Sequence, residues 1–156
     1  MIALLMVAEV TVDTVKNWEI VEGSKDCLAR GEFKDGTTLE IGLAHSRKWS
    51  SMVLWNDRWK SVSEDKKYNV RVQFDNAEPQ DVSAEGMTTA DSGGLYLSWD
   101  DYGILPQAMS AHTLRLWNGD SFIGGYSLAG TKDAILQVAR CSGRASVQVK
   151  EDPFAQ

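Results

Sequence analysis

Apolar and polar residues alternate over several short stretches of the chain, which predicts β-strands with one buried face. Polar side chains stand between the apolar ones, as a sheet with one wet face requires, so we expect the sheet to be antiparallel. Turn-forming residues such as Lys34-Asp35-Gly36 separate the stretches. The alternating apolar positions are Leu39, Ile41 and Leu43, then Tyr68, Val70, Val72 and Phe74, then Leu95, Leu97 and Trp99, then Leu114 and Leu116.

Glycines mark special points of these strands. Asn118-Gly119 lies between two apolar stretches, and both residues tolerate a positive φ, which predicts a type I′ hairpin turn. Gly93-Gly94 and Gly124-Gly125 lack the neighbours that a phosphate-binding loop needs. They predict a bulge or a tight bend at a corner of the sheet.

Helical periodicity follows the strands. The spacing predicts a helix over 131–142, with Thr131 as its N-cap and Gly143 as its terminator. Its inward face is predicted to hold Ala134, Ile135, Val138, Ala139 and Cys141.

A shorter helix is predicted over 104–112, capped by Asp100 or Asp101. Residues 145–150 alternate again, which indicates a last strand before a loose tail at 151–156.

Residues 1–156 are expected to form a single, mainly β domain, because the length is typical of one core and no linker divides the chain. The pattern favours an antiparallel β-sandwich or a strongly bent sheet of about seven to nine strands, with the C-terminal helix packed on it. Residues 1–16 are either a leader remnant or an edge element. The apolar run Ile2 to Ala8 is too short to span a membrane, so no transmembrane segment is expected.

The charge balance limits the classes of partner that the protein is expected to bind. There are 22 Asp and Glu residues against 16 Lys and Arg, a net charge of -6, and the basic residues form only isolated pairs. A nucleic-acid backbone would be repelled by such a surface, so a nucleic-acid partner is excluded.

Cys27 and Cys141 both face the predicted core. Either they form a disulfide that ties an early strand to the late helix, or they are two separate buried thiols of a reduced protein. Two cysteines and two distant histidines do not make a zinc site, and we expect no metal and no cofactor.

Catalytic motifs are weak. The stretch Gly125-Tyr126-Ser127-Leu128-Ala129 lacks the second glycine of a nucleophile elbow, and neither histidine follows it in the chain. Carboxylates on or beside loops could serve a two-carboxylate hydrolase, although solvated turn residues are the more ordinary explanation; they are Asp57, Glu64, Asp65, Asp75, Asp91, Asp100 and Asp101. Asp100 and Asp101 stand out because Trp99 and Tyr102 flank them, yet the pair is equally a helix cap.

The chain has six tryptophans, and four of them are candidate binding residues. Residues 52–55 are apolar on both faces, which predicts a central strand with Trp55 in the core, whereas Trp59 lies between two cations and is expected nearer the surface. Exposed aromatic side chains bind sugar rings or protein partners. The candidates are Trp49, Trp59, Trp99 and Trp117, together with Asp100, Asp101 and Tyr102.

A series of landmarks runs from residue 18 to 142. They are Cys27-x-Ala29, Asp35-Gly36-Thr37-x-Leu39, Trp49 to Trp59, Tyr68-x-Val70-x-Val72-x-Phe74-Asp75, and Leu128-x-Gly130-Thr131-x-x-Ala134 followed by Cys141. Their order resembles that of small bacterial envelope proteins of the invasion-associated locus B type. The resemblance implies a secretion signal, a β-sandwich-like body, paired cysteines and an oxidising compartment, but no active site.

These observations favour a non-enzymatic interaction domain, periplasmic or secreted, with a protein or glycan partner. Three alternatives stay open: a carbohydrate or small-ligand module that uses exposed tryptophans, a two-carboxylate hydrolase, and a cytoplasmic protein with reduced thiols.

Overall fold

The sheet carries the architecture. In the computed structural model, which describes residues 10–15, 17–22, 26–44 and 49–146, ten antiparallel strands form one sheet in the order β1-β2-β3-β4-β5-β8-β7-β6-β9-β10. The strands are β1 (Val10–Val15), β2 (Trp18–Glu22), β3 (Cys27–Glu32), β4 (Thr38–Ala44), β5 (Trp49–Asn56), β6 (Lys67–Phe74), β7 (Gln80–Thr88), β8 (Gly93–Trp99), β9 (Thr113–Asn118) and β10 (Ser121–Ser127).

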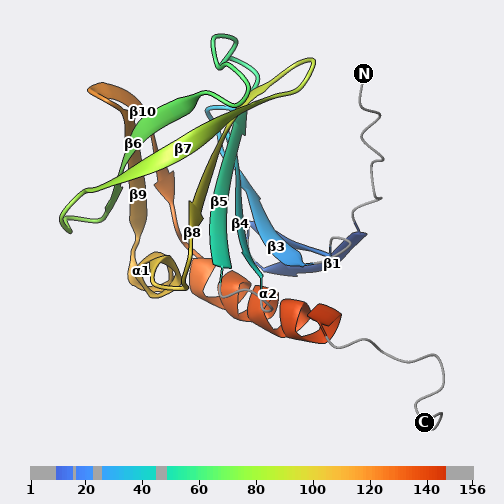
Figure 1. Cartoon of the computed structure of the whole chain (residues 1–156). Coiled ribbons are helices and arrows are strands. Elements are labelled where there is room, and N and C mark those ends of the chain that lie inside the picture. The colour runs from blue at the N-terminus through green and yellow to red at the C-terminus, as the bar shows by residue number, and fades with distance from the viewer. Residues whose placement is uncertain (1–9, 16, 23–25, 45–48, 147–156) are drawn as a thin grey trace, which may run out of the picture.

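The sheet curls into a half-barrel, so the bent sheet, and not the sandwich, is the correct alternative (Figure 1). It has ten strands, against the seven to nine that the pattern predicts. The strand β1 lies at one edge of the sheet, and residues 1–9 lie outside the described residues.

Two helices lie under one end of the half-barrel. The helix α2 (Thr131–Ser146) packs against β2, β3, β4 and α1 (Ile104–Ser110), whereas the β5–β6 and β7–β8 loops lie at the opposite end (Figure 1). Alternate residues of each strand point inward and are covered by one another and by the helices. The core includes Ile20, Ala29, Leu39, Ile41, Met52, Leu54, Val70, Val72, Leu97, Leu114, Leu116, Ala134, Ile135 and Val138.

Polar contacts hold the curl where the late strand β10 approaches the β3–β4 turn. The Tyr126 and Thr37 hydroxyl oxygens lie 3.1 Å apart, and the Asn56 amide donates to the Thr37 hydroxyl at 3.0 Å. The Phe33 and Tyr126 rings meet edge-on, with their centroids 4.9 Å apart. Residues 89 positions apart in the chain are thereby joined across the open side of the half-barrel.

The predicted helix over 131–142 is confirmed, but three of its details are wrong. Ala139 is exposed, because it lies about 140° around the helix from Ala134. Gly143 lies inside α2, which continues to Ser146, so the chain at 145–146 is helical and not a strand. The Thr131 hydroxyl is buried without a hydrogen-bond partner in the described part of the chain, so it caps nothing.

Residues 147–150 of the predicted last strand and the tail at 151–156 lie outside the described residues. The shorter helix α1 ends at Ser110, and Gly103 occupies its N-cap position without a side-chain bond. Asp101 instead accepts a hydrogen bond from the Gly103 amide at 2.9 Å, which makes a turn ahead of the helix.

The hairpin at Asn118 is confirmed, with a shifted turn. Asn118 pairs with Ser121, so Gly119 and Asp120 are the two central residues. Only Gly119 of the two has a positive φ, +58°, as a type II′ turn requires. The register shifts between Phe122 and Gly124, so the predicted bulge at this glycine pair is also present.

Candidate functional site

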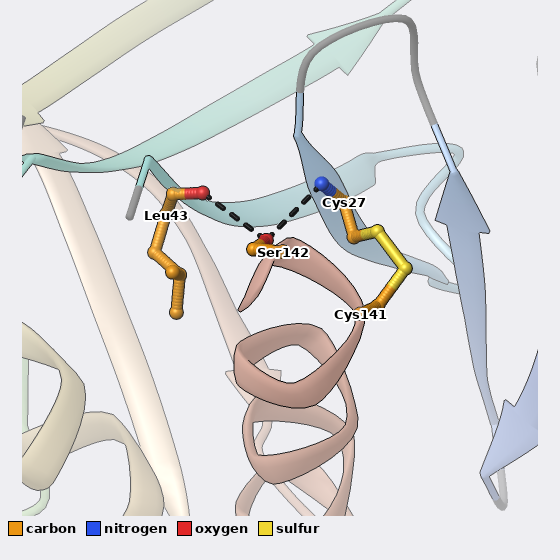
Figure 2. Close-up of a disulfide and its surroundings, with 4 residues drawn as sticks. All are labelled: Cys27, Leu43, Cys141 and Ser142. Carbon is orange, nitrogen blue, oxygen red and sulfur yellow. Dashed lines mark hydrogen bonds between the residues drawn. A yellow bond between two sulfur atoms is a disulfide. The ribbon is translucent and has the colours of Figure 1, made fainter. Parts of the chain in front are cut away.

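The two cysteines close the helical end of the molecule. Cys27 at the start of β3 and Cys141 on α2 form a disulfide with a Cα–Cα distance of 5.8 Å (Figure 2). The neighbouring Ser142 hydroxyl accepts a hydrogen bond from the Cys27 amide at 3.2 Å and donates one to the Leu43 carbonyl at 3.4 Å. We call this set of contacts between α2 and the strands the stapled end. Of the two alternatives for the cysteines, a disulfide or two separate thiols, the structure therefore has the disulfide.

The predicted binding residues do not gather into one site. Trp99 and Tyr102 are half-buried near α1, while Asp100 and Asp101 are exposed. The Asp101 backbone carbonyl accepts a hydrogen bond from the Ser50 hydroxyl at 2.6 Å. This segment therefore reads as a structured turn between β8 and α1.

Trp55 is half-buried on the outer face of β5, so the prediction that it is a core residue is wrong. Its ring lies over Gly94, where a Cβ would be 2.6 Å from the Trp55 Cε3 atom, so the glycine pair on β8 makes room for close packing and not for a bulge. The side chain of Trp49 lies outside the described residues.

Trp117 belongs to an exposed cluster on the outer face of the half-barrel. Its ring packs against Phe122 on β10, with centroids 5.5 Å apart, and the Phe122 side chain is 60% exposed. Gly125 leaves the neighbouring strand bare, so the Phe122 ring and the Arg115 stem both lie within about 4 Å of where a Cβ would stand. Trp117, Phe122, Arg115 and Gly125 are hereafter the outer aromatic patch.

Trp59 lines a cavity at the end of the half-barrel opposite α2. This cavity, hereafter the mouth pocket, has a volume of about 320 Å³. Leu95 of the inner face lies at its buried floor, and the β5–β6 loop and the β9–β10 hairpin border it. Its lining residues are Arg58, Trp59, Lys60, Ser61, Val62, Tyr68, Leu95, Asn118 and Ile123.

The β5–β6 loop reaches the pocket through two glycines. A Cβ at Gly93 would overlap the Trp59 carbonyl oxygen, and a Cβ at Gly86 would overlap the Ser63 carbonyl oxygen. The Asp65 amide also donates to the Gly86 carbonyl at 2.9 Å. Glycine is therefore needed at both strand positions for the loop to lie across the inner face.

Sequence reasoning identified Trp59 but missed the rest of the mouth pocket. The signal available was its position between Arg58 and Lys60, which indicated an exposed end of the strand. Ile123 could not be assigned to the pocket, because the bulge at 122–124 turns Phe122 outward and Ile123 toward the cavity.

A second cleft, of about 690 Å³, follows the open side of the half-barrel between β10 and the β3–β4 turn. Tyr126 lies beside it, and burial is the main reason that the pKa of its phenol is raised, to about 12. Asp35, which accepts from the Tyr126 hydroxyl at 3.4 Å, adds to the increase. A tyrosine held neutral in this way acts as a structural hydrogen-bonding group at neutral pH.

Across 10–15, 17–22, 26–44 and 49–146, no group of three or more His, Cys, Asp or Glu side chains lies close enough to hold a metal ion. Within the same ranges, no helix combines the length and the apolar character needed to cross a membrane.

Comparison with known proteins finds a similar structure but no matching sequence. No model of a protein family matches the sequence, and no curated protein matches it. The crystal structure of invasion associated protein B from Bartonella henselae matches with a TM-score of 0.64 and 15% identity, over 86% of this chain and 99% of that one. The two proteins share a fold. The resemblance to invasion-associated locus B proteins that the sequence predicts is thus confirmed at the level of fold.

Proposed function

We propose that this chain is a non-enzymatic protein-binding domain of the cell envelope or the secreted fraction, and that the outer aromatic patch is its contact surface. The observation that carries the proposal is Phe122, a large apolar side chain that is 60% exposed and packs at a tilt against Trp117 at the edge strand of the sheet. Aromatic and arginine side chains at an exposed surface provide most of the binding energy in protein interfaces.

The disulfide supports the assignment to an oxidising compartment. Disulfides persist in oxidising compartments and are rare in the reduced cytosol, and Cys27–Cys141 is a buried bond that joins the sheet to α2. The structural neighbour is described as invasion associated, which is compatible with a protein that acts at or outside the envelope.

The composition of the patch indicates its partner. Arg115 lies exposed on the same face of β9 as Trp117. On the neighbouring strand β6, Arg71 lies opposite Trp117, and its Nε atom pairs with the Asp81 Oδ1 atom at 3.2 Å. Arg115 therefore offers a positive charge beside an apolar surface. The proposed partner is a protein that presents an apolar side chain next to a carboxylate. The apolar side chain would contact Phe122, and the carboxylate would pair with Arg115.

Site-specific photo-crosslinking in the producing cell tests the proposal. A benzoylphenylalanine placed at position 122 should give one discrete crosslinked protein, and the crosslinked peptide should carry an Asp or Glu beside an apolar residue. Arg115→Glu should remove that product. The matched control is the same crosslinker at position 136 on α2, because Leu136 is also an exposed large apolar residue, at 40%.

Equal products from positions 122 and 136, or a product at 122 that survives Arg115→Glu, would contradict the proposed surface. A crosslink only to a second copy of this chain would replace the proposed partner with self-association.

A further inference from the structure

The mouth pocket is lined by apolar residues and by two cationic residues. Leu95 at the floor is 5% exposed, and the half-buried Trp59, Val62 and Ile123 form the walls. Arg58 and Lys60 stand among the lining residues, and no carboxylate side chain does so in the part of the chain that the structure describes.

We infer that the mouth pocket binds a small amphipathic anion, a carboxylate with an apolar tail. Ligand sites of this kind occur in the mouths of β-barrels, where a few polar groups fix the orientation of an otherwise apolar ligand. At about 30 Å³ for each non-hydrogen atom, a cavity of about 320 Å³ holds about ten of them. Octanoate, with eight carbons and two oxygens, has this size.

The charge of the pocket runs against that of the chain. The whole protein has a net charge of -6, which repels anions in general, yet two cations line this cavity. Selection of an anion must therefore come from the local arrangement of Arg58 and Lys60. A neutral or cationic ligand would leave these two groups without a charged partner.

Both cations are anchored but retain free donors. Arg58 donates through one terminal nitrogen to the Asp35 carbonyl at 2.7 Å, and Lys60 donates to the Asp91 carbonyl at 2.7 Å. A guanidinium has five N–H donors and an ammonium has three, so each can also bind a carboxylate oxygen. Anchoring fixes the side chains beforehand, which reduces the entropy lost when a ligand binds.

Part of the apolar wall, Leu95 and Ile123, comes from strands that carry neither cation. The Trp59 backbone rests against Gly93, and Ile123 is turned toward the cavity by the bulge in β10. Head and tail recognition can therefore be changed separately by substitution.

Isothermal titration calorimetry on the oxidised full chain tests the inference with three probes. Sodium octanoate carries head and tail, sodium acetate carries the head only, and 1-octanol carries the tail only. We expect octanoate to bind, acetate to give no heat of binding, and 1-octanol to bind about tenfold more weakly than octanoate. Equal affinity for octanoate and 1-octanol would overturn the role of the cations, and no octanoate binding at millimolar concentration would overturn the inference.

Two variants and one control locate the site. Lys60→Gln with Arg58→Gln should lower octanoate affinity about tenfold and leave 1-octanol affinity unchanged, and Lys60→Gln alone should show a smaller loss if the double variant does not fold. Ile123→Glu should abolish octanoate binding. Lys66→Gln is the matched control, because Lys66 is a cation of the same loop that lies over the Tyr68 ring, 5.2 Å from its centroid, and does not line the cavity.

The control should retain octanoate affinity within about twofold, whereas an equal loss in Lys66→Gln would reduce the effect to long-range attraction and overturn the inference. Nuclear magnetic resonance supplies a readout that does not depend on affinity. The Trp59 indole N–H signal should shift with octanoate, while that of Trp18, which donates to the Ala129 carbonyl at 3.1 Å, should stay in place. Shifts confined to Trp117 would assign the ligand to the outer aromatic patch instead and overturn the inference.

Discussion

The stapled end and the mouth of the half-barrel are built in opposite ways. At the stapled end, a disulfide, a fully buried serine and the apolar face of α2 close the inner face of the sheet. At the mouth, a loop held by backbone contacts to Gly86 and Gly93 covers the same face incompletely and leaves a cavity. This fold therefore places a covalent bond and buried hydrogen bonds at one end and keeps a cavity at the other.

The largest expected effect concerns the disulfide. Cys27→Ala with Cys141→Ala should lower the free energy of unfolding by about 4 kcal/mol, because the bond closes a loop spanning 114 positions of the unfolded chain. Urea denaturation of parent and variant measures it. A change in the free energy of unfolding under about 1 kcal/mol would show that the disulfide does not stabilise the stapled end as proposed.

The next largest effect concerns the β5–β6 loop at the mouth of the half-barrel. Gly93→Ala should cost about 1 to 3 kcal/mol, because the new Cβ overlaps the Trp59 carbonyl and pushes the β5–β6 loop away. Gly125→Ala is its control, since a Cβ there meets only ordinary contacts at 3.8 and 3.9 Å. Denaturation of both variants, with equal losses, would show that the loop is not held at Gly93.

A smaller effect is the pH dependence of stability that Tyr126 causes. The pKa of Tyr126 is raised from 10 to about 12 in the folded chain, so the unfolded chain loses its phenol proton first as the pH rises. The stability that Tyr126 contributes should be complete below pH 10 and fall between about pH 10 and 12. Tyr126→Phe should cost about 1 kcal/mol at pH 7 and flatten this decline. An unchanged pH profile in that variant would assign the decline to other groups.

The smallest effect separates binding from stability. Phe122→Ser should change the free energy of unfolding by no more than about 0.5 kcal/mol, because the side chain is already 60% exposed. Thermal unfolding followed by circular dichroism checks this. A loss of several kcal/mol would make Phe122 a packing residue and weaken the case for the outer aromatic patch.

Much of the fold followed from the sequence pattern, and the pattern failed for identifiable reasons. The alternation at Leu39, Ile41 and Leu43, and the helix face through Ala134 and Val138, depend on local periodicity, which one short stretch reveals. Trp55 was misplaced, because apolar residues on both sides of a strand do not show that a second layer covers it.

The candidate site depends on longer-range geometry. The mouth pocket brings together Trp59, Leu95 and Ile123 from three parts of the chain. Pairing of β5 with β8 places Trp59 near Leu95, and the curl of the sheet brings Ile123 to them. The outer aromatic patch depends on a bulge that decides which of Phe122 and Ile123 faces outward. Single-residue slips of this kind reverse the two faces of a strand and leave little trace in the sequence.

Native-state hydrogen exchange, with the disulfide intact and reduced, tests the contrast between the two ends most directly. The amide of Val138 within α2 should exchange only through global unfolding, and reduction should speed its exchange on the order of a thousandfold. The amide of Val62 in the β5–β6 loop, whose bond to the Trp59 carbonyl is long at 3.4 Å, should exchange by local opening and change little on reduction. Equal protection of the two amides, or an equal response to reduction, would contradict the account.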